Sequence, residues 1–244
     1  MKKDLFKVIF NEKIAAGVYR MTLRGDTSEI KRPGQFVNFA IDGLYLRRPV
    51  SVCDVEGDLL TVIYKVVGKG TEKMANAAEE DVFDLLTGLG NGYDTNPTKA
   101  GKKPLLIGGG VGVPPLYLLA KELIENGAEP TAVLGFNSAA DVFYEEEFKK
   151  LGCGVFVTTV DGSHGKKGFV TDALPGEYTH FYTCGPLPML KAVFAKTVTD
   201  GQLSLEERMG CGFGACMGCS IMTAGGAKRI CKDGPVFAKS ELLW

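Results

Sequence analysis

The stretch that decides the fold is Leu105-Leu106-Ile107-Gly108-Gly109-Gly110-Val111-Gly112-Val113-Pro114-Pro115. Its apolar start predicts a short buried strand, its glycines a turn, and its prolines the first turn of a helix, where N–H groups have no intrahelical partner. Exposed N–H groups at such a helix start favour phosphate. The run G-G-G-V-G-V-P-P departs from the G-x-G-x-x-G dinucleotide fingerprint. A glycine-rich turn that serves only close packing is therefore the alternative to a nucleotide site.

Strands and helices alternate after this stretch, within residues 96–200. The strands are expected at Thr131–Phe136, Val155–Val160 and His180–Cys184, and the helices at Leu116–Asn126, Val142–Lys150 and Pro186–Val198. Such alternation predicts a parallel sheet covered by helices.

A second glycine–proline turn, Cys184-Gly185-Pro186, ends the last of these strands. Ligands of open α/β sheets bind at the carboxyl ends of the strands, so the two turns together predict a nicotinamide dinucleotide site. The segment Gly135-Phe136-Asn137-Ser138 contains no Arg or Lys. Because a 2′-phosphate usually requires a nearby cation, this favours NAD over NADP.

Residues 1–95 are rich in short β-branched and aromatic runs separated by Gly, Pro and Asp, which predicts a β-barrel or sandwich. A short helix is expected at Gly70–Ala78 and a linker at Asn91–Lys103. The expected strands are Lys7–Ile9, Val18–Leu23, Phe36–Ala40, Val50–Val55 and Leu59–Val67.

Two segments of this domain are suited to a flavin nucleotide. In Leu46-Arg47-Arg48-Pro49-Val50-Ser51-Val52, an arginine can pair with a pyrophosphate and Ser51 can hydrogen-bond a flavin ring. Gly70 and Thr71 offer a backbone and a hydroxyl donor to the same phosphates. The alternative is a strand with two solvated arginines and an ordinary glycine turn.

The final segment, residues 201–244, contains Cys211, Cys216, Cys219 and Cys231 in the spacing C-x4-C-x2-C-x11-C. This spacing is typical of plant-type [2Fe–2S] clusters. Glycines between the cysteines let the backbone wrap tightly and bring amide N–H groups toward the sulfur atoms. Structural zinc and free thiols are the alternatives, but zinc sites usually have paired C-x2-C knuckles and only Cys216 and Cys219 form one.

Nicotinamide exchanges two electrons as a hydride, whereas a [2Fe–2S] cluster exchanges one electron at a time. A flavin does both. A nicotinamide site and a cluster loop in one chain therefore predict a flavin, and residues 1–95 are the domain left to hold it.

Composition sets limits on function. The chain has 244 residues, 45% of them hydrophobic, and a net charge of −1, which provides no general attraction to nucleic acid or anionic lipid. We expect no membrane span and no signal peptide. The odd number of cysteines, seven, favours a reducing compartment, by default the cytoplasm. Cys53, Cys153 and Cys184 are interpreted as small buried residues, and His164 and His180 as hydrogen-bonded rather than catalytic.

Together these motifs resemble the ferredoxin–NADP reductase superfamily and, within it, the electron-transfer subunits of type B dihydroorotate dehydrogenases. The resemblance covers essentially the whole chain. It rests on L-R-R-P-V-S at 46–51, I-Y-K-V-V-G-K-G-T at 63–71, G-G-G-V-G-V-P-P-L at 108–116, C-G-P-L-P-M-L at 184–190, E-R-M-G-C-G-F-G-A-C-M-G-C at 207–219 and C-K-D-G-P-V-F at 231–237.

The resemblance implies an antiparallel FAD barrel, an NAD-binding α/β domain and a small [2Fe–2S] domain. It also implies a partner, an FMN-containing catalytic subunit that oxidises dihydroorotate to orotate in pyrimidine biosynthesis, in a heterotetramer with two copies of each chain. Electrons would pass from FMN through the cluster and FAD to NAD+.

The implied contacts form five groups. Lys65 stands where the family often has arginine, so it keeps the charge without the planar fork. The FAD contacts are Arg48, Pro49, Val50 and Ser51, then Ile63, Tyr64 and Lys65, then Gly70 and Thr71; the NAD contacts are Gly108, Gly109, Gly110 and Gly112 with Cys184, Gly185 and Pro186; the cluster ligands are the four cysteines of residues 201–244.

Two other functions use the same residues. One is a reductase subunit of an NADP–ferredoxin transhydrogenase, a sulfide dehydrogenase or an oxygenase. The other is a zinc-stabilised binding module with a vestigial nucleotide fold. Flavin and [2Fe–2S] absorption bands distinguish the reductases from the zinc module.

Overall fold

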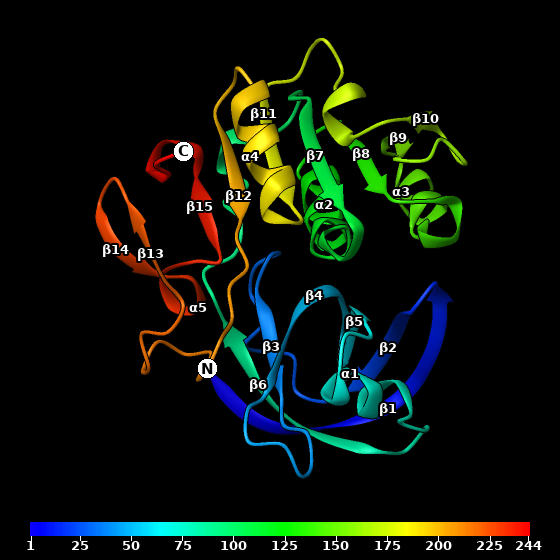
Figure 1. Ribbon diagram of the computed structural model, residues 1–244, viewed down its shortest axis with the longest axis vertical. Coiled ribbons are helices and arrows are strands. Elements are labelled where there is room, and N and C mark those ends of the chain that lie inside the picture. Colours follow the sequence, from blue (N-terminus) through cyan, green and yellow to red (C-terminus); the bar gives the residue numbers. More distant parts are fainter.

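The computed structural model describes residues 1–244, and its N-terminal part is a closed six-stranded antiparallel barrel with the order β1-β2-β5-β4-β3-β6 (Figure 1). The predicted barrel is thus confirmed and the sandwich is excluded. Its elements are β1 (Lys2–Ala15), β2 (Val18–Arg24), β3 (Phe36–Phe39), β4 (Arg48–Glu56), β5 (Leu59–Lys65), α1 (Lys69–Ala75) and β6 (Val82–Leu89).

Side-chain alternation explains why the barrel closes. On β1, Phe6 and Val8 are fully buried while Lys7 between them is exposed, so alternate residues fill the interior. The prediction covered only Lys7–Ile9 of strand β1. It was too short because charged residues on the outer face of the strand interrupt the apolar run. Strand β6 was not predicted from the sequence, although it pairs with both β1 and β3 and completes the closure.

The second part is a seven-stranded sheet with the order β10-β9-β8-β7-β11-β12-β15, in which the first six strands run parallel and β15 runs antiparallel to β12. The fold-deciding stretch supplies β7, the central strand. The strands are β7 (Pro104–Gly109), β8 (Thr131–Phe136), β9 (Gly154–Thr159), β10 (Lys166–Lys167), β11 (His180–Cys184), β12 (Gly201–Ser204) and β15 (Val236–Ala238).

Helices cover both faces of this sheet, as predicted (Figure 1). Helix α2 (Pro115–Glu125) and α3 (Glu145–Leu151) pack on the face toward the barrel, where Leu116, Leu119 and Phe148 join one hydrophobic core. Helix α4 (Leu187–Lys196) covers the opposite face through Leu190 and Val193.

The C-terminal part returns from the sheet to the barrel. Between β12 and β15 lie the cysteine loop, the hairpin of β13 (Ser220–Thr223) and β14 (Gly226–Arg229), and α5 (Ile230–Asp233) (Figure 1). Residues 201–204 and 236–238 are strands of the nucleotide-binding sheet, so this sheet extends beyond residues 96–200. The domain boundaries 1–95, 96–200 and 201–244 remain predictions.

The barrel and the sheet share one hydrophobic core. Val18, Cys53 and Ile63 of the barrel are buried in the same cluster as Leu119 and Leu134 of the sheet domain. The predicted linker at 91–103 is packed rather than loose, because Tyr93 is buried and its hydroxyl donates to the Thr183 carbonyl at 3.1 Å. No helix in residues 1–244 is long and apolar enough to cross a membrane.

Candidate functional site

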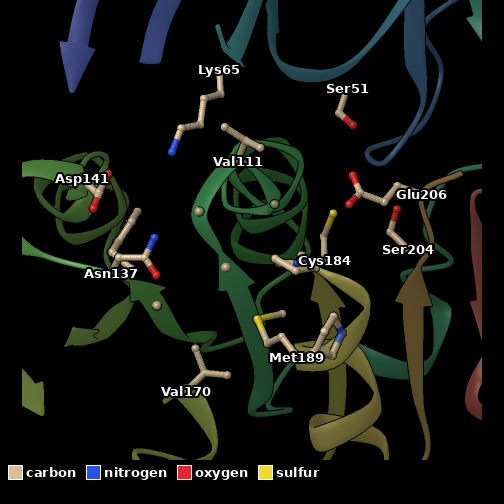
Figure 2. Close-up of a pocket in the computed structure, with 18 of the residues that line it drawn as sticks. Ser51, Lys65, Val111, Asn137, Asp141, Val170, Cys184, Met189, Ser204 and Glu206 are labelled. Carbon is tan, nitrogen blue, oxygen red and sulfur yellow. The ribbon is translucent and has the colours of Figure 1, made fainter. Parts of the chain in front are cut away.

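A cleft of about 690 Å³ separates the barrel from the carboxyl ends of the sheet strands (Figure 2). This volume is typical of a small-molecule or cofactor site. Ten of the residues predicted to bind a cofactor line it. Four come from the barrel, Pro49, Val50, Ser51 and Lys65, and six come from the two turns of the sheet, Gly109, Gly110, Gly112, Cys184, Gly185 and Pro186.

The two glycine turns pack directly against each other. A Cβ atom at Gly112 would overlap the backbone carbonyl of Cys184, and Gly110 has a positive φ of 52°. Gly108 is different, because a Cβ there would meet Val113 Cγ2 at 2.9 Å and the residue does not line the cleft. Gly108 therefore serves packing, while Gly109, Gly110 and Gly112 face the cleft, where nucleotide contact remains a prediction.

Four side chains meet at the inner end of the cleft (Figure 2). Ser51 of the barrel lies opposite Glu206, and the Cys184 sulfur points toward both from the sheet side, with Ser204 next to Glu206. Glu206 remains open to water in the cleft, but burial by the surrounding walls and then the charge of Glu207 raise its pKa. Glu206 and Ser204 were missed from the sequence because no motif marks the end of β12.

The other end of the cleft has a mixed charge (Figure 2). The Lys65 amine extends from the barrel toward Asn137 and Asp141 of the sheet domain. Asp141 accepts a hydrogen bond from the Ser138 hydroxyl at 2.9 Å. A carboxylate after the second strand suits a ribose hydroxyl and repels a 2′-phosphate, so the structure strengthens the preference for NAD.

The remaining predicted flavin contacts are not among the residues that line the cleft. The Arg48 guanidinium packs against Gly70 and donates to the Leu46 carbonyl at 2.6 Å. The Thr71 hydroxyl accepts from the Val67 N–H at 2.9 Å. Arg48, Gly70 and Thr71 are thus close together at the start of α1, as a shared phosphate site requires.

Ile63 and Tyr64 do not point into the cleft. Each is 3% exposed, and the Tyr64 hydroxyl donates to Asn11 Oδ1 at 3.0 Å inside the barrel. Their side chains stabilise the core, so a flavin contact by these two residues is possible only through the backbone and remains a prediction.

The four cysteines of the C-terminal loop form two pairs. The Cys216 N–H donates to the Cys211 sulfur at 3.4 Å, and the Cys231 N–H donates to the Cys219 sulfur at 3.4 Å. Cys219 and Cys231 are buried at 1% and 2% exposure, whereas Cys216 is exposed. Two pairs of thiols match the two irons of a [2Fe–2S] cluster, each of which takes two protein ligands.

Local electrostatics suit thiolate ligands. Burial acts to raise the pKa of Cys211, but the N–H groups of Cys216, Phe213 and Ala215 outweigh it and lower that pKa to about 6. The pKa of Cys231 is raised to about 12, first by burial and then by the neighbouring Cys219 and Cys211. Such a crowded set of sulfurs is stabilised when bound iron neutralises the thiolate charge.

No three Cys, His, Asp or Glu side chains are arranged around a single point that suits one metal ion. The paired arrangement of the cysteines is what a binuclear cluster uses.

Two of the other three cysteines and both histidines lie outside the cleft lining. Cys53 and Cys153 are buried, as predicted, whereas Cys184 is half-buried and lines the cleft. His164 Nε2 contacts Glu145 at 2.7 Å, and His180 Nε2 lies 3.4 Å from the Gln202 amide.

A closed antiparallel barrel docked on a parallel sheet, with a nucleotide cleft between them and a four-cysteine loop beside them, defines a nicotinamide-dependent reductase that carries an iron–sulfur cluster. Models of known families agree with this class. Residues 206–243 match the iron-sulfur cluster binding domain of dihydroorotate dehydrogenase B, and residues 106–194 match the oxidoreductase NAD-binding domain.

Curated relatives match from end to end. The electron transfer subunit of dihydroorotate dehydrogenase B (NAD(+)) from Fusobacterium nucleatum is 44% identical, with 99% of each chain covered. The subunit of the same name from Shouchella clausii is 42% identical, with 99% of this chain and 98% of the relative covered. The chain belongs to the family of dihydroorotate dehydrogenase B electron transfer subunits.

Solved structures share the fold. A chain from the NADH-dependent reduced ferredoxin-NADP oxidoreductase superposes with a TM-score of 0.88 at 32% identity, over 98% of this chain and 90% of that one. The flavohem-like FAD/NAD-binding domain of nitric oxide dioxygenase from Vibrio cholerae superposes with a TM-score of 0.67 at 22% identity, over 79% of this chain and 91% of that one. The second match, at low identity, shows the fold alone.

Proposed function

We propose that this protein carries electrons between the catalytic subunit of an NAD+-linked dihydroorotate dehydrogenase and NAD+, in pyrimidine biosynthesis. The observation that carries this proposal is the end-to-end match to the Fusobacterium nucleatum electron transfer subunit, at 44% identity over 99% of both chains. We propose the cytoplasm as the compartment, which fits seven cysteines without a disulfide.

The residues fit the proposed cofactors FAD and [2Fe–2S]. When bound, FAD exchanges a hydride with NAD(H) and single electrons with the cluster. Ser51 on the barrel side and Cys184 on the sheet side face the inner cleft, where they would orient a flavin ring and a nicotinamide. Arg48, Gly70 and Thr71 would hold the FAD phosphates, and the turn at Gly109–Gly112 would hold those of NAD.

The catalytic subunit is proposed to dock over the exposed side of the cysteine loop. Cys216 is exposed, and so are the apolar side chains of Phe213 and Met217 in the same loop and of Met222 in β13. A partner that buries these side chains would bring its own FMN near the cluster. We propose an FMN-containing partner and an assembly of two copies of each chain.

The experiment is to express the chain with the catalytic subunit encoded by the same genome and to purify the complex. We expect flavin and [2Fe–2S] absorption bands together with dihydroorotate-dependent reduction of NAD+. A colourless, zinc-loaded chain would contradict any reductase function. A complex that is coloured but inactive with dihydroorotate would contradict this assignment.

A second function is supported by the structural match to the NADH-dependent reduced ferredoxin-NADP oxidoreductase, at 32% identity. In that case the stable partner would be an NADP-binding flavoprotein. Reduction of NADP+ by NADH and reduced ferredoxin in the purified complex, without activity on dihydroorotate, would favour this second function.

A further inference from the structure

Asn38 lies between the flavin side of the barrel and the cysteine loop. It is on β3, where it pairs with Pro49 of β4 and with Leu86 of β6. Its neighbours Val37 and Phe39 fill the barrel core, so Asn38 points outward by the alternation of strand residues. Strand β3 runs next to the C-terminal segment (Figure 1).

The Asn38 side chain reaches the cluster loop directly. Its Nδ2 donates to the backbone carbonyl of Cys211 at 3.4 Å, although 173 residues separate the two in the chain. Gly212, buried and with a φ of 79°, lies against the same amide, and a Cβ atom there would overlap Asn38 Nδ2. The loop thus has room for Asn38 only because residue 212 is glycine.

The backbone of Asn38 is itself held in place. Arg47 donates from Nη1 to the Asn38 carbonyl at 3.1 Å and from Nη2 to the Asp84 carboxylate at 2.8 Å. These contacts fix the backbone from which the Asn38 amide extends to the cysteine loop. Side chains that adjust the properties of a functional site usually need such support from their surroundings.

The Asn38 amide is only partly satisfied. Asn38 is 1% exposed, and its Oδ1 has no hydrogen-bond partner in the protein. A buried unpaired acceptor destabilises a protein, and a leucine of similar size would avoid this penalty. Packing alone therefore does not account for an asparagine at this position.

We propose that Asn38 is a positioning residue that fastens the cluster loop to the flavin barrel and sets the reduction potential of the cluster. Hydrogen bonds and net charge around a cluster control its potential. The N–H end of the amide faces Cys211, so its positive end favours the more negative, reduced cluster. Loss of this donor makes the potential more negative, and a carboxylate in its place makes it more negative still.

The test uses the full-length chain with FAD and cluster bound, in the variants Asn38→Leu and Asn38→Asp. The readout is a redox titration of the cluster followed by electron paramagnetic resonance. At a fixed poise, we expect the ratio of reduced to oxidised cluster to fall about two- to tenfold in Asn38→Leu, the range that one neutral hydrogen bond supports. A larger fall is expected in Asn38→Asp, while reduction of FAD by NADH keeps its wild-type rate.

The matched control is Asn11→Leu. Asn11 is an asparagine of the same barrel whose Nδ2 donates to the Met74 carbonyl at 2.8 Å, away from the cysteine loop. This variant is expected to lose thermal stability without a change in cluster potential. If Asn38→Leu does not fold, Asn38→Ser tests the same contact, because its hydroxyl is too short to reach Cys211.

Wild-type cluster potentials in the Asn38 variants, or an equal shift in Asn11→Leu, would overturn the proposal. The inference rests on the cluster and not on the identity of the electron donor. Because the experiment uses NADH and no partner subunit, its failure would leave the dihydroorotate assignment untouched, and failure of that assignment would leave the role of Asn38 intact.

Discussion

The four cysteines predicted to hold the cluster differ in exposure, and this difference separates two sides of the loop. Cys219 and Cys231 pack in one hydrophobic cluster with Phe36 and Leu89 of the barrel, while Cys216 faces solvent. The buried pair therefore lies against the barrel, and an outside protein has access to the exposed side.

Replacement of Cys216 tests the cluster at the scale of one residue. Because each iron needs two thiolates, Cys216→Ser is expected to lose most of its iron and sulfide, which is checked by iron analysis and visible absorption. NADH reduction of an artificial acceptor through FAD should continue. The control Cys153→Ala removes a buried thiol of the sheet domain and should keep a full cluster. A complete cluster in Cys216→Ser would show that this ligand is assigned incorrectly.

Buried His180 is expected to make the free energy of unfolding depend on pH. Burial lowers its pKa below the ordinary value of 6.5, so the folded state binds a proton less readily than the unfolded state. Its contribution to stability is then complete above about pH 6.5 and is lost as the pH falls through the lowered pKa. The melting temperature of His180→Gln should therefore fall less than that of the wild type between about pH 7 and pH 5.

The exposed His164, on the surface with Glu145, provides the control. We expect His164→Gln to retain the acid sensitivity of the wild type. Melting curves of both variants across this pH range give the comparison, and an unchanged pH profile in His180→Gln would contradict the role of burial.

At the scale of elements, the central strand β7 belongs to the core of the sheet, and the glycine turn that follows it lines the cleft. The turn must approach the end of β11 so closely that Gly112 touches the backbone of Cys184. A side chain on residue 112 would separate the two turns that line the cleft. The same backbone approach therefore determines both packing and the shape of the nucleotide site.

Gly112→Ala is expected to lower the stability by about 1–3 kcal/mol, the usual effect of overpacking a rigid contact. It should also weaken NADH binding, because the cleft wall must move. Chemical denaturation and NADH titration measure the two effects. Gly176→Ala is the control, since a Cβ there meets no atom within 4 Å. Equal stability and equal NADH affinity of the two variants would contradict the close contact between Gly112 and the Cys184 backbone.

At the scale of the whole molecule, a charged contact joins the two large domains. Lys121 of α2 lies 2.8 Å from Asp54 Oδ1 of β4 and 3.1 Å from Glu56 Oε1. Asp54 is 14% exposed, so it depends on this partner. Together with the shared hydrophobic core, the contact fixes the orientation of the barrel on the sheet and hence the width of the cleft.

Lys121→Met should lower the stability by about 1–3 kcal/mol, because it leaves the Asp54 carboxylate partly buried without a partner. The control Lys7→Met breaks an exposed pair with Glu80, where a change below about 1 kcal/mol is expected. Thermal unfolding compares them. Asp54→Asn added to Lys121→Met should recover part of the loss, and no recovery would contradict the pairing.

Local patterns in the sequence determined the barrel class and the α/β sheet, and they predicted the cofactor motifs and the cysteine ligand set. Strand alternation, glycine turns and C-x4-C-x2-C spacing are short-range signals, and each depends on neighbouring residues alone. The prediction missed β6 because its exposed face and its glycine hide the alternation, although pairing with β1 and β3 stabilises it.

Contacts between distant residues were decided only by the tertiary structure. It brought Glu206 to Ser51 and Cys184, turned Ile63 and Tyr64 into the core, and placed Asn38 against Cys211. The sequence spacing of these residues could not predict their contacts, because the contacts arise where separate strands and loops pack together. The chain thus encodes its cofactor motifs locally, whereas the geometry between the cofactor sites follows from the packing of the barrel, the sheet and the cysteine loop.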